Sequence, residues 1–89
     1  HEETEVQRIK QAFGEVVCRR REAARFDQRP FSRTVGISNS HLRAIESGQV
    51  SPTVVTIYKI CSVLECSAAD LFAEVDAFLS VSDKSHPKR

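Results

Sequence analysis

Apolar residues recur at every third or fourth position along most of the chain, the spacing that places side chains on one face of an α-helix. Between these stretches lie glycine, proline, serine and aspartate, residues that commonly start or stop helices. The pattern predicts five short helices, and no stretch has the strict alternation typical of a half-buried β-strand. The sequence therefore predicts an all-α fold.

The first two predicted helices occupy the N-terminal part of the chain. The first runs from Thr4 to about Ala24, and Thr4 with Gln7 three residues later has the pattern of a capping box. The second follows Asp27, a candidate N-cap, and ends at Gly36, which can adopt the left-handed conformation that stops a helix. Their inward-facing apolar residues are Val6, Ile9, Phe13, Val16, Val17, Phe31 and Val35.

The third and fourth predicted helices follow at once. Ser38 can cap the third, which ends at Gly48. Ser51 and Pro52 predict the start of the fourth, because a proline in the first turn lacks only an amide that has no partner there. The inward-facing residues of both helices are Leu42, Ile45, Val54, Ile57, Ile60, Cys61 and Leu64.

Ser67, with Asp70 three residues later, predicts the start of a fifth helix that continues to about Ser82. Its apolar positions are Leu71, Phe72, Val75, Phe78 and Leu79. Residues 83–89 are polar, and we expect them to form a flexible tail.

Composition narrows the class of function. A chain of 89 residues, 40% hydrophobic and 28% charged, is typical of one small globular domain, too short to enclose a large catalytic cavity. No combination of residues resembles a catalytic triad, a paired-carboxylate site, a phosphate loop or a metal site. We therefore expect a non-enzymatic protein without cofactor or metal, which binds through its surface. The lack of a long apolar run or a signal-like start favours a cytoplasmic location without membrane contact.

The three cysteines also favour the cytoplasm, because an odd number without paired CxxC spacing predicts free thiols. Cys61 and Cys66 lie at positions where buried apolar residues are expected. Cys18 precedes three consecutive arginines, whose charge would lower the pKa of its thiol and leaves a redox role open.

The net charge of +1 conceals a strongly basic stretch in the middle of the chain. Residues 19–43 contain seven arginines against Glu22 and Asp27, a net charge of +5, whereas acidic residues gather toward both ends. A basic segment of this kind can be an ordinary solvated face or a surface that binds nucleic acid. The arrangement of the predicted helices decides between these two interpretations.

The second and third predicted helices form a helix-turn-helix, two short helices joined at Gly36 with the second opened by Ser38. At this point the sequence between Phe13 and Phe72 resembles the Cro and lambda-repressor type of helix-turn-helix domain, also called Xre-like. The residues that carry the resemblance are Arg21, Asp27-Gln28, Gly36-Ile37-Ser38, Leu42, Ile45-Glu46, Gly48, Pro52, Lys59-Ile60, Leu64, Ser67 and Asp70-Leu71-Phe72.

The resemblance implies a compact five-helix lambda-repressor-like fold whose third helix lies in the major groove of DNA. It implies DNA contacts by Gln28, Ser38, Asn39, Ser40, His41, Arg43, Ala44 and Gln49. Gln28 would contact a phosphate at a helix N-terminus, and Asn39 could pair with adenine. Arg43 could reach either a guanine or a phosphate. For each of these residues the alternative is ordinary polar surface.

The resemblance also implies that Arg21 and Glu46 form a partly buried salt bridge, which fixes the fold. The sequence departs from the family pattern at four positions. Arg20 replaces a leucine, Ser32 replaces a small alanine, and Arg25 and Glu65 replace turn glycines.

Outside residues 13–72, residues 1–12 extend the first helix and residues 73–89 form the end of the fifth helix and the tail. The apolar positions in these extensions either pack on each other or form a two-fold interface. In the second case Leu71, Val75, Phe78 and Leu79 would join two copies in a homodimer. A dimer would hold two recognition helices roughly 34 Å apart and read a pseudo-palindrome.

The sequence thus predicts a sequence-specific regulator of transcription, of bacterial or phage type, that binds double-stranded DNA. The alternative is a protein-interaction module, such as an antitoxin-like partner, for which DNA binding is secondary.

Overall fold

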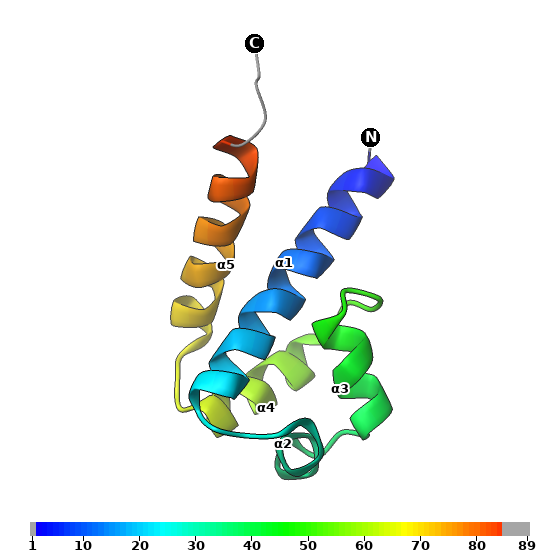
Figure 1. Ribbon diagram of the computed structural model, residues 1–89, viewed down its shortest axis with the longest axis vertical. Helices are drawn as coiled ribbons and strands as arrows, with labels where there is room; N and C mark the ends of the chain where they lie inside the picture. Colours follow the sequence, from blue (N-terminus) through cyan, green and yellow to red (C-terminus); the bar gives the residue numbers. More distant parts are fainter. Residues whose placement is uncertain (1, 85–89) are drawn as a thin grey trace.

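Five helices follow one another along the part of the chain described by the computed structural model, residues 2–84, with side chains placed for residues 4–81. They are α1 (Glu2–Ala23), α2 (Gln28–Val35), α3 (Asn39–Glu46), α4 (Val54–Leu64) and α5 (Ala68–Lys84). The two long helices α1 and α5 lie side by side, and the three short helices gather around the C-terminal half of α1 (Figure 1). The all-α fold of five helices expected from the sequence is confirmed.

The core lies where the short helices meet α1 and the first turns of α5. Phe31, Leu42, Ile45, Ile60 and Leu71 are fully buried, one or two from each of the four later helices. α1 contributes Ala12, Phe13, Val16 and Val17. Most of the inward-facing positions predicted by the helical spacing do pack, and burial of apolar surface stabilises the arrangement. The prediction is wrong for Val6, Ile9 and Val54, which are 46%, 46% and 67% exposed.

Three of the predicted helix ends are confirmed. Gly36 has φ +93°, the left-handed conformation that ends α2. The Oγ of Ser38 accepts a hydrogen bond from the backbone N–H of His41 at 3.0 Å, and the Oγ of Ser67 accepts one from Asp70 at 2.9 Å. Each hydroxyl satisfies one of the amides that a helix start leaves without a backbone partner.

Other predicted ends are wrong or only partly right. Thr4 lies inside α1, which already includes Glu2, so it does not cap the helix. Ser51 does not cap α4 either, because the helix begins at Val54 and the hydroxyl of Thr53 accepts from the N–H of Thr56. Ser51 and Thr53, two residues apart, can each serve as a cap, and the helical period alone does not choose between them.

Asp27 has the extended backbone of an N-cap but makes no side-chain capping hydrogen bond. α3 ends at Glu46, two residues before Gly48, which takes φ +80° in the following turn. α5 continues to Lys84, beyond the predicted end near Ser82, and the rest of the predicted tail, 85–89, lies outside the described residues.

α1 and α5 pack on each other within the protomer, which is one of the two arrangements expected for their apolar residues. Leu71 and Val75 are buried, and Phe78 and Leu79 are partly buried against the same core. The rings of Phe13 and Phe72 lie 5.7 Å apart. Of the four residues expected at a dimer interface, only Phe78 and Leu79 therefore keep surface that a second copy could contact.

No helix within residues 2–84 is long and apolar enough to span a lipid bilayer.

Candidate nucleic-acid interface

The turn between α2 and α3 fixes how the two short helices cross. The N–H groups of Gly36 and Ile37 both donate to the carbonyl oxygen of Ser32, at 2.8 and 3.0 Å, which completes the C-terminal cap of α2. Ser38 then starts α3 at once. Phe31, Leu42 and the other buried residues of both helices face the same core, so the opposite side of α3 points outward.

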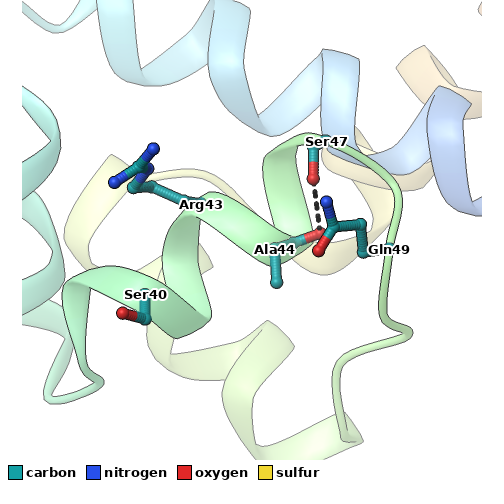
Figure 2. A pocket seen from close by; sticks show the side chains of 5 residues that line it. All are labelled: Ser40, Arg43, Ala44, Ser47 and Gln49. Atoms are coloured by element: carbon teal, nitrogen blue, oxygen red, sulfur yellow. Dashed lines mark hydrogen bonds between the residues drawn. The ribbon is translucent and has the colours of Figure 1, made fainter.

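This outward side of α3 carries a hollow of about 300 Å³ lined by Ser40, Arg43, Ala44, Ser47 and Gln49 (Figure 2). Ser40, Arg43, Ser47 and Gln49 are exposed, and Ala44 is half-buried. Four residues expected to contact DNA are thus brought together in one place. Ser47 is a fifth member that the sequence did not single out, although it lies one residue past α3 on the same side as Arg43.

Two of the residues expected to contact DNA are less accessible. Asn39 is half-buried, and its Oδ1 atom is buried with no hydrogen-bond partner among the described residues. A bidentate contact between Asn39 and adenine, which needs both the amide oxygen and nitrogen, would require the side chain to turn outward. His41 is half-buried on the first turn of α3.

Gln28 opens α2, as expected, but its side chain already has a partner in the protein. Its Nε2 donates to Oε1 of Glu46 at 2.9 Å. The carboxylate at the end of α3 therefore holds the amide at the start of α2, and the helix N-terminus beside it remains a place where an anion is favoured.

Arg21 and Glu46 form a buried salt bridge, with side chains only 8% and 5% exposed. The Arg21 Nε–Glu46 Oε2 distance is 2.7 Å and the Nη2–Oε1 distance is 3.1 Å, the bidentate geometry that a guanidinium and a carboxylate favour. Hydrogen bonding to Glu46 raises the pKa of Arg21 above its usual value. Nη1 of Arg21 also donates to the carbonyl oxygen of Phe26 at 2.7 Å, which ties down the loop before α2.

The basic stretch of residues 19–43 divides into two groups. Arg19, Arg20 and Arg21 pair with Glu15, Glu74 and Glu46, at 3.0, 2.6 and 2.7 Å. The other four arginines are exposed and have no ion-pair partner among the described residues: Arg25, Arg29, Arg33 and Arg43. The positive charge available to a ligand is thus concentrated on α2, α3 and the turn before α2.

The position of α3 on α1 depends on residues that the sequence analysis missed. A Cβ atom on Gly14 would lie 2.3 Å from the carbonyl oxygen of Ile45, so the end of α3 contacts the backbone of α1 directly. Nε2 of Gln7 donates to the carbonyl oxygen of Gly48 at 3.0 Å. A glycine inside a predicted helix can mark such a close approach, and this was the signal available in the sequence.

The expectation that neighbouring arginines lower the pKa of Cys18 is wrong. Burial raises that pKa, and the carboxylates of Glu46 and Glu22 act in the same direction. The charge and the hydrogen bond of Arg21, whose Nη2 lies 3.6 Å from the sulfur, are smaller effects. No cluster of three or more metal-binding side chains was found within the described part of the chain.

Comparison with known proteins agrees with this geometry. The helix-turn-helix family matches residues 19–71, more than half of the chain. The clp gene regulator ClgR from Corynebacterium glutamicum has a similar structure, with a TM-score of 0.83 and 18% sequence identity over 86% of this chain and 82% of that one. The restriction-modification controller protein C.AhdI from Aeromonas hydrophila has a TM-score of 0.67 and 24% identity over 68% of this chain and 92% of that one.

No curated protein sequence matches the chain significantly. The identities to the two solved structures are low, so those similarities concern the fold.

Proposed function

Because the chain belongs to the helix-turn-helix family of DNA-binding domains, of the Cro and lambda-repressor type, we propose that it recognises a specific sequence of double-stranded DNA and regulates transcription. α3 is the element that enters the major groove, which is about 12 Å wide and admits an α-helix. The two structural relatives are named as a gene regulator and a controller protein, and this supports the regulatory part of the proposal.

The observation that carries the proposal is the hollow on the outward side of α3, with Arg43 exposed at its edge and without an ion-pair partner among the described residues. A guanidinium in this place can donate two hydrogen bonds to a guanine edge or neutralise a phosphate. Ser40 accepts or donates to any base, and the methyl group of Ala44 can contact a thymine methyl.

The arginines on and before α2 would hold the duplex against α3. Arg25, Arg29 and Arg33 are exposed, and charges of this kind neutralise phosphates and release counterions. Gln28 would contribute to phosphate binding through the backbone at the N-terminus of α2, while its side-chain amide remains hydrogen-bonded to Glu46. Affinity should therefore fall steeply with salt.

We further propose a homodimer that reads a pseudo-palindrome. Val54, Val55 and Tyr58 on α4 are each more than 60% exposed. Beside them a groove of about 310 Å³ between α1, α4 and α5 has apolar walls that include Ile9, Ile57, Phe72 and Leu79. A second copy of the same surface would cover these exposed apolar side chains.

Selection of bound duplexes from a random pool tests the DNA proposal, followed by competition titrations at two salt concentrations. Arg43→Ala should lower affinity for the selected site, and loss of preference at one base pair would assign it to base reading. A uniform loss with a salt slope smaller by about one would assign it to a phosphate.

Arg19→Ala is the matched control, because it removes the same charge from α1, where Arg19 pairs with Glu15. Failure of the unmodified chain to bind any duplex at low salt would contradict the proposal. Equal losses for Arg43→Ala and Arg19→Ala would contradict the role of α3.

A further inference from the structure

Two cysteines meet at the end of α4. Cys61 lies in the last turn of the helix, and Cys66 follows Glu65, which takes the left-handed conformation with φ +58°. The N–H of Cys66 donates to the carbonyl oxygen of Cys61 at 3.1 Å, and the N–H of Glu65 donates to that of Ser62 at 3.2 Å. This pair of hydrogen bonds is a Schellman motif, in which the side chains at the two ends of the turn contact each other.

The Schellman turn places the two thiols at its two ends, but they differ in their surroundings. Cys61 is 3% exposed, and burial, followed by the neighbouring Cys66, raises its pKa to about 11. Cys66 is partly exposed, so a small molecule can reach it.

Arg20 adds a cation beside this pair. Its guanidinium donates to Glu74 at 2.6 Å, and its charge lowers the pKa of Cys61, although burial and Cys66 have larger effects in the opposite direction. A positive charge stabilises negative charge that develops on sulfur. A charged arginine where the family has leucine, and an ordered left-handed glutamate where it has glycine, thus both lie next to the cysteines.

We propose that Cys61 and Cys66 form an oxidation site at which hydrogen peroxide produces an intramolecular disulfide. The sulfur of Cys66 attacks one peroxide oxygen, the O–O bond breaks, and water leaves, which gives a sulfenic acid on Cys66. The sulfur of Cys61 then attacks the Cys66 sulfur, the S–O bond breaks, and a second water leaves with the Cys61 proton. Peroxide is reduced by the two electrons that the two thiols give up.

Cys18 serves as an internal comparison. Its sulfur lies beneath Arg21 in α1, and burial raises its pKa. Cys61 lies in the last turn of α4 and Cys66 on the connection to α5, and in Figure 1 this connection is on the opposite side of the molecule from α3. The disulfide would therefore fasten α4 to the start of α5 without covering the outward side of α3.

Peptide mass spectrometry after limited treatment of the folded chain with hydrogen peroxide tests the site. Trypsin releases residues 60–84, which contain both cysteines, and residues 11–19, which contain Cys18. The expected product is peptide 60–84 lighter by two hydrogens. When this oxidised peptide is cut again after Glu65, the disulfide should hold the two fragments together until dithiothreitol reduces it.

Variants make the outcome specific. Cys66→Ser should abolish the loss of two hydrogens and leave Cys61 reduced, whereas Cys18→Ser should leave the disulfide unchanged. Circular dichroism checks that each variant is folded, and Cys66→Ala provides a second test if the serine variant is not. Oxidation of Cys18 before the pair would overturn the proposal, as would conversion of Cys66 to a sulfinic acid without a link, or cross-linking between chains.

Discussion

The Cα of Gly14 faces the carbonyl oxygen of Ile45 so closely that an added Cβ atom would lie 2.3 Å from that oxygen. The same atom would lie 2.7 Å from the carbonyl oxygen of Glu46. These are backbone atoms at the end of α3, so no side-chain rotation can make room. The distance between α1 and the proposed recognition helix therefore depends on the absence of one methyl group.

Gly14→Ala should destabilise the fold by about 3 kcal/mol, because the methyl group forces α3 away from α1. Helix propensity alone would favour the alanine by about 1 kcal/mol, so the sign of the effect separates the two influences. Urea unfolding followed by circular dichroism measures it. Gly36→Ala is the control: nothing lies within 4 Å of the added atom, and the positive φ should cost only about 1 kcal/mol. A Gly14→Ala protein as stable as the original would contradict the close contact.

Glu46→Ala should cost about 3 kcal/mol of the free energy of unfolding, since it removes the buried bidentate partner of Arg21 and leaves the guanidinium only the exposed carboxylate of Glu22, 4.0 Å away. Glu15→Ala removes the carboxylate of an exposed pair with Arg19 and should cost at most about 0.5 kcal/mol. The loss at Glu46 should persist in high salt, because a buried pair is poorly screened. Similar small losses for both variants would show that the Glu46 pair is not desolvated.

The stability of the chain should fall between about pH 9 and pH 11 through Cys61. Burial raises the pKa of this thiol to about 11, from an ordinary value of 9.0 that applies to the unfolded chain. The unfolded chain therefore loses the proton first as the pH rises, and ionisation favours unfolding. The loss of folding free energy through Cys61 is absent well below pH 9 and reaches at most about 3 kcal/mol by pH 11.

Thermal unfolding at a series of pH values, under reducing conditions, measures this loss. Cys61→Ala is the control, because it removes the thiol while other groups still titrate. An alanine variant whose stability declines as steeply as that of the original chain would assign the loss to other groups.

The chain should be a dimer at micromolar concentration, and Val54→Asp with Tyr58→Asp should make it monomeric. Both side chains are more than 60% exposed in the protomer, so the helical content should be retained. Light scattering gives the mass, and Thr34→Asp, at an exposed position of α2, is the control. A monomeric original chain would refute the interface.

Val75→Asp should instead unfold the protomer, since Val75 is 3% exposed.

The helices and most of the core could be predicted from sequence because they depend on local signals. Gly36, Ser38 and Ser67 act within a few residues of themselves, and each does in the structure what its type and position indicated. The start of α4 could not be predicted in the same way, since Ser51 and Thr53 are both suitable caps. The choice between them depends on how the loop packs.

The candidate site was predictable as a set of residues and less so as a set of contacts. Ser40, Arg43, Ala44 and Gln49 do line one hollow. The buried oxygen of Asn39 depends instead on tertiary neighbours, which no local pattern encodes.

The pairing of Arg20 with Glu74 depends on the same kind of tertiary contact. It also reduces the charge that the basic stretch offers to a ligand.

The carboxylate of Glu46 accepts hydrogen bonds from Arg21 on α1 and Gln28 on α2, and it is the last residue of α3. For protein engineering, this divides α3 into exchangeable and fixed positions. Under the proposed function, Ser40 and Arg43 could be exchanged for the corresponding residues of another regulator to transfer its operator preference, because neither hydrogen-bonds to Glu46. A graft that also replaced Glu46 would remove the hydrogen bonds to both α1 and α2. Loss of DNA binding by such a graft would then result from a disrupted fold and not from the choice of residues on α3.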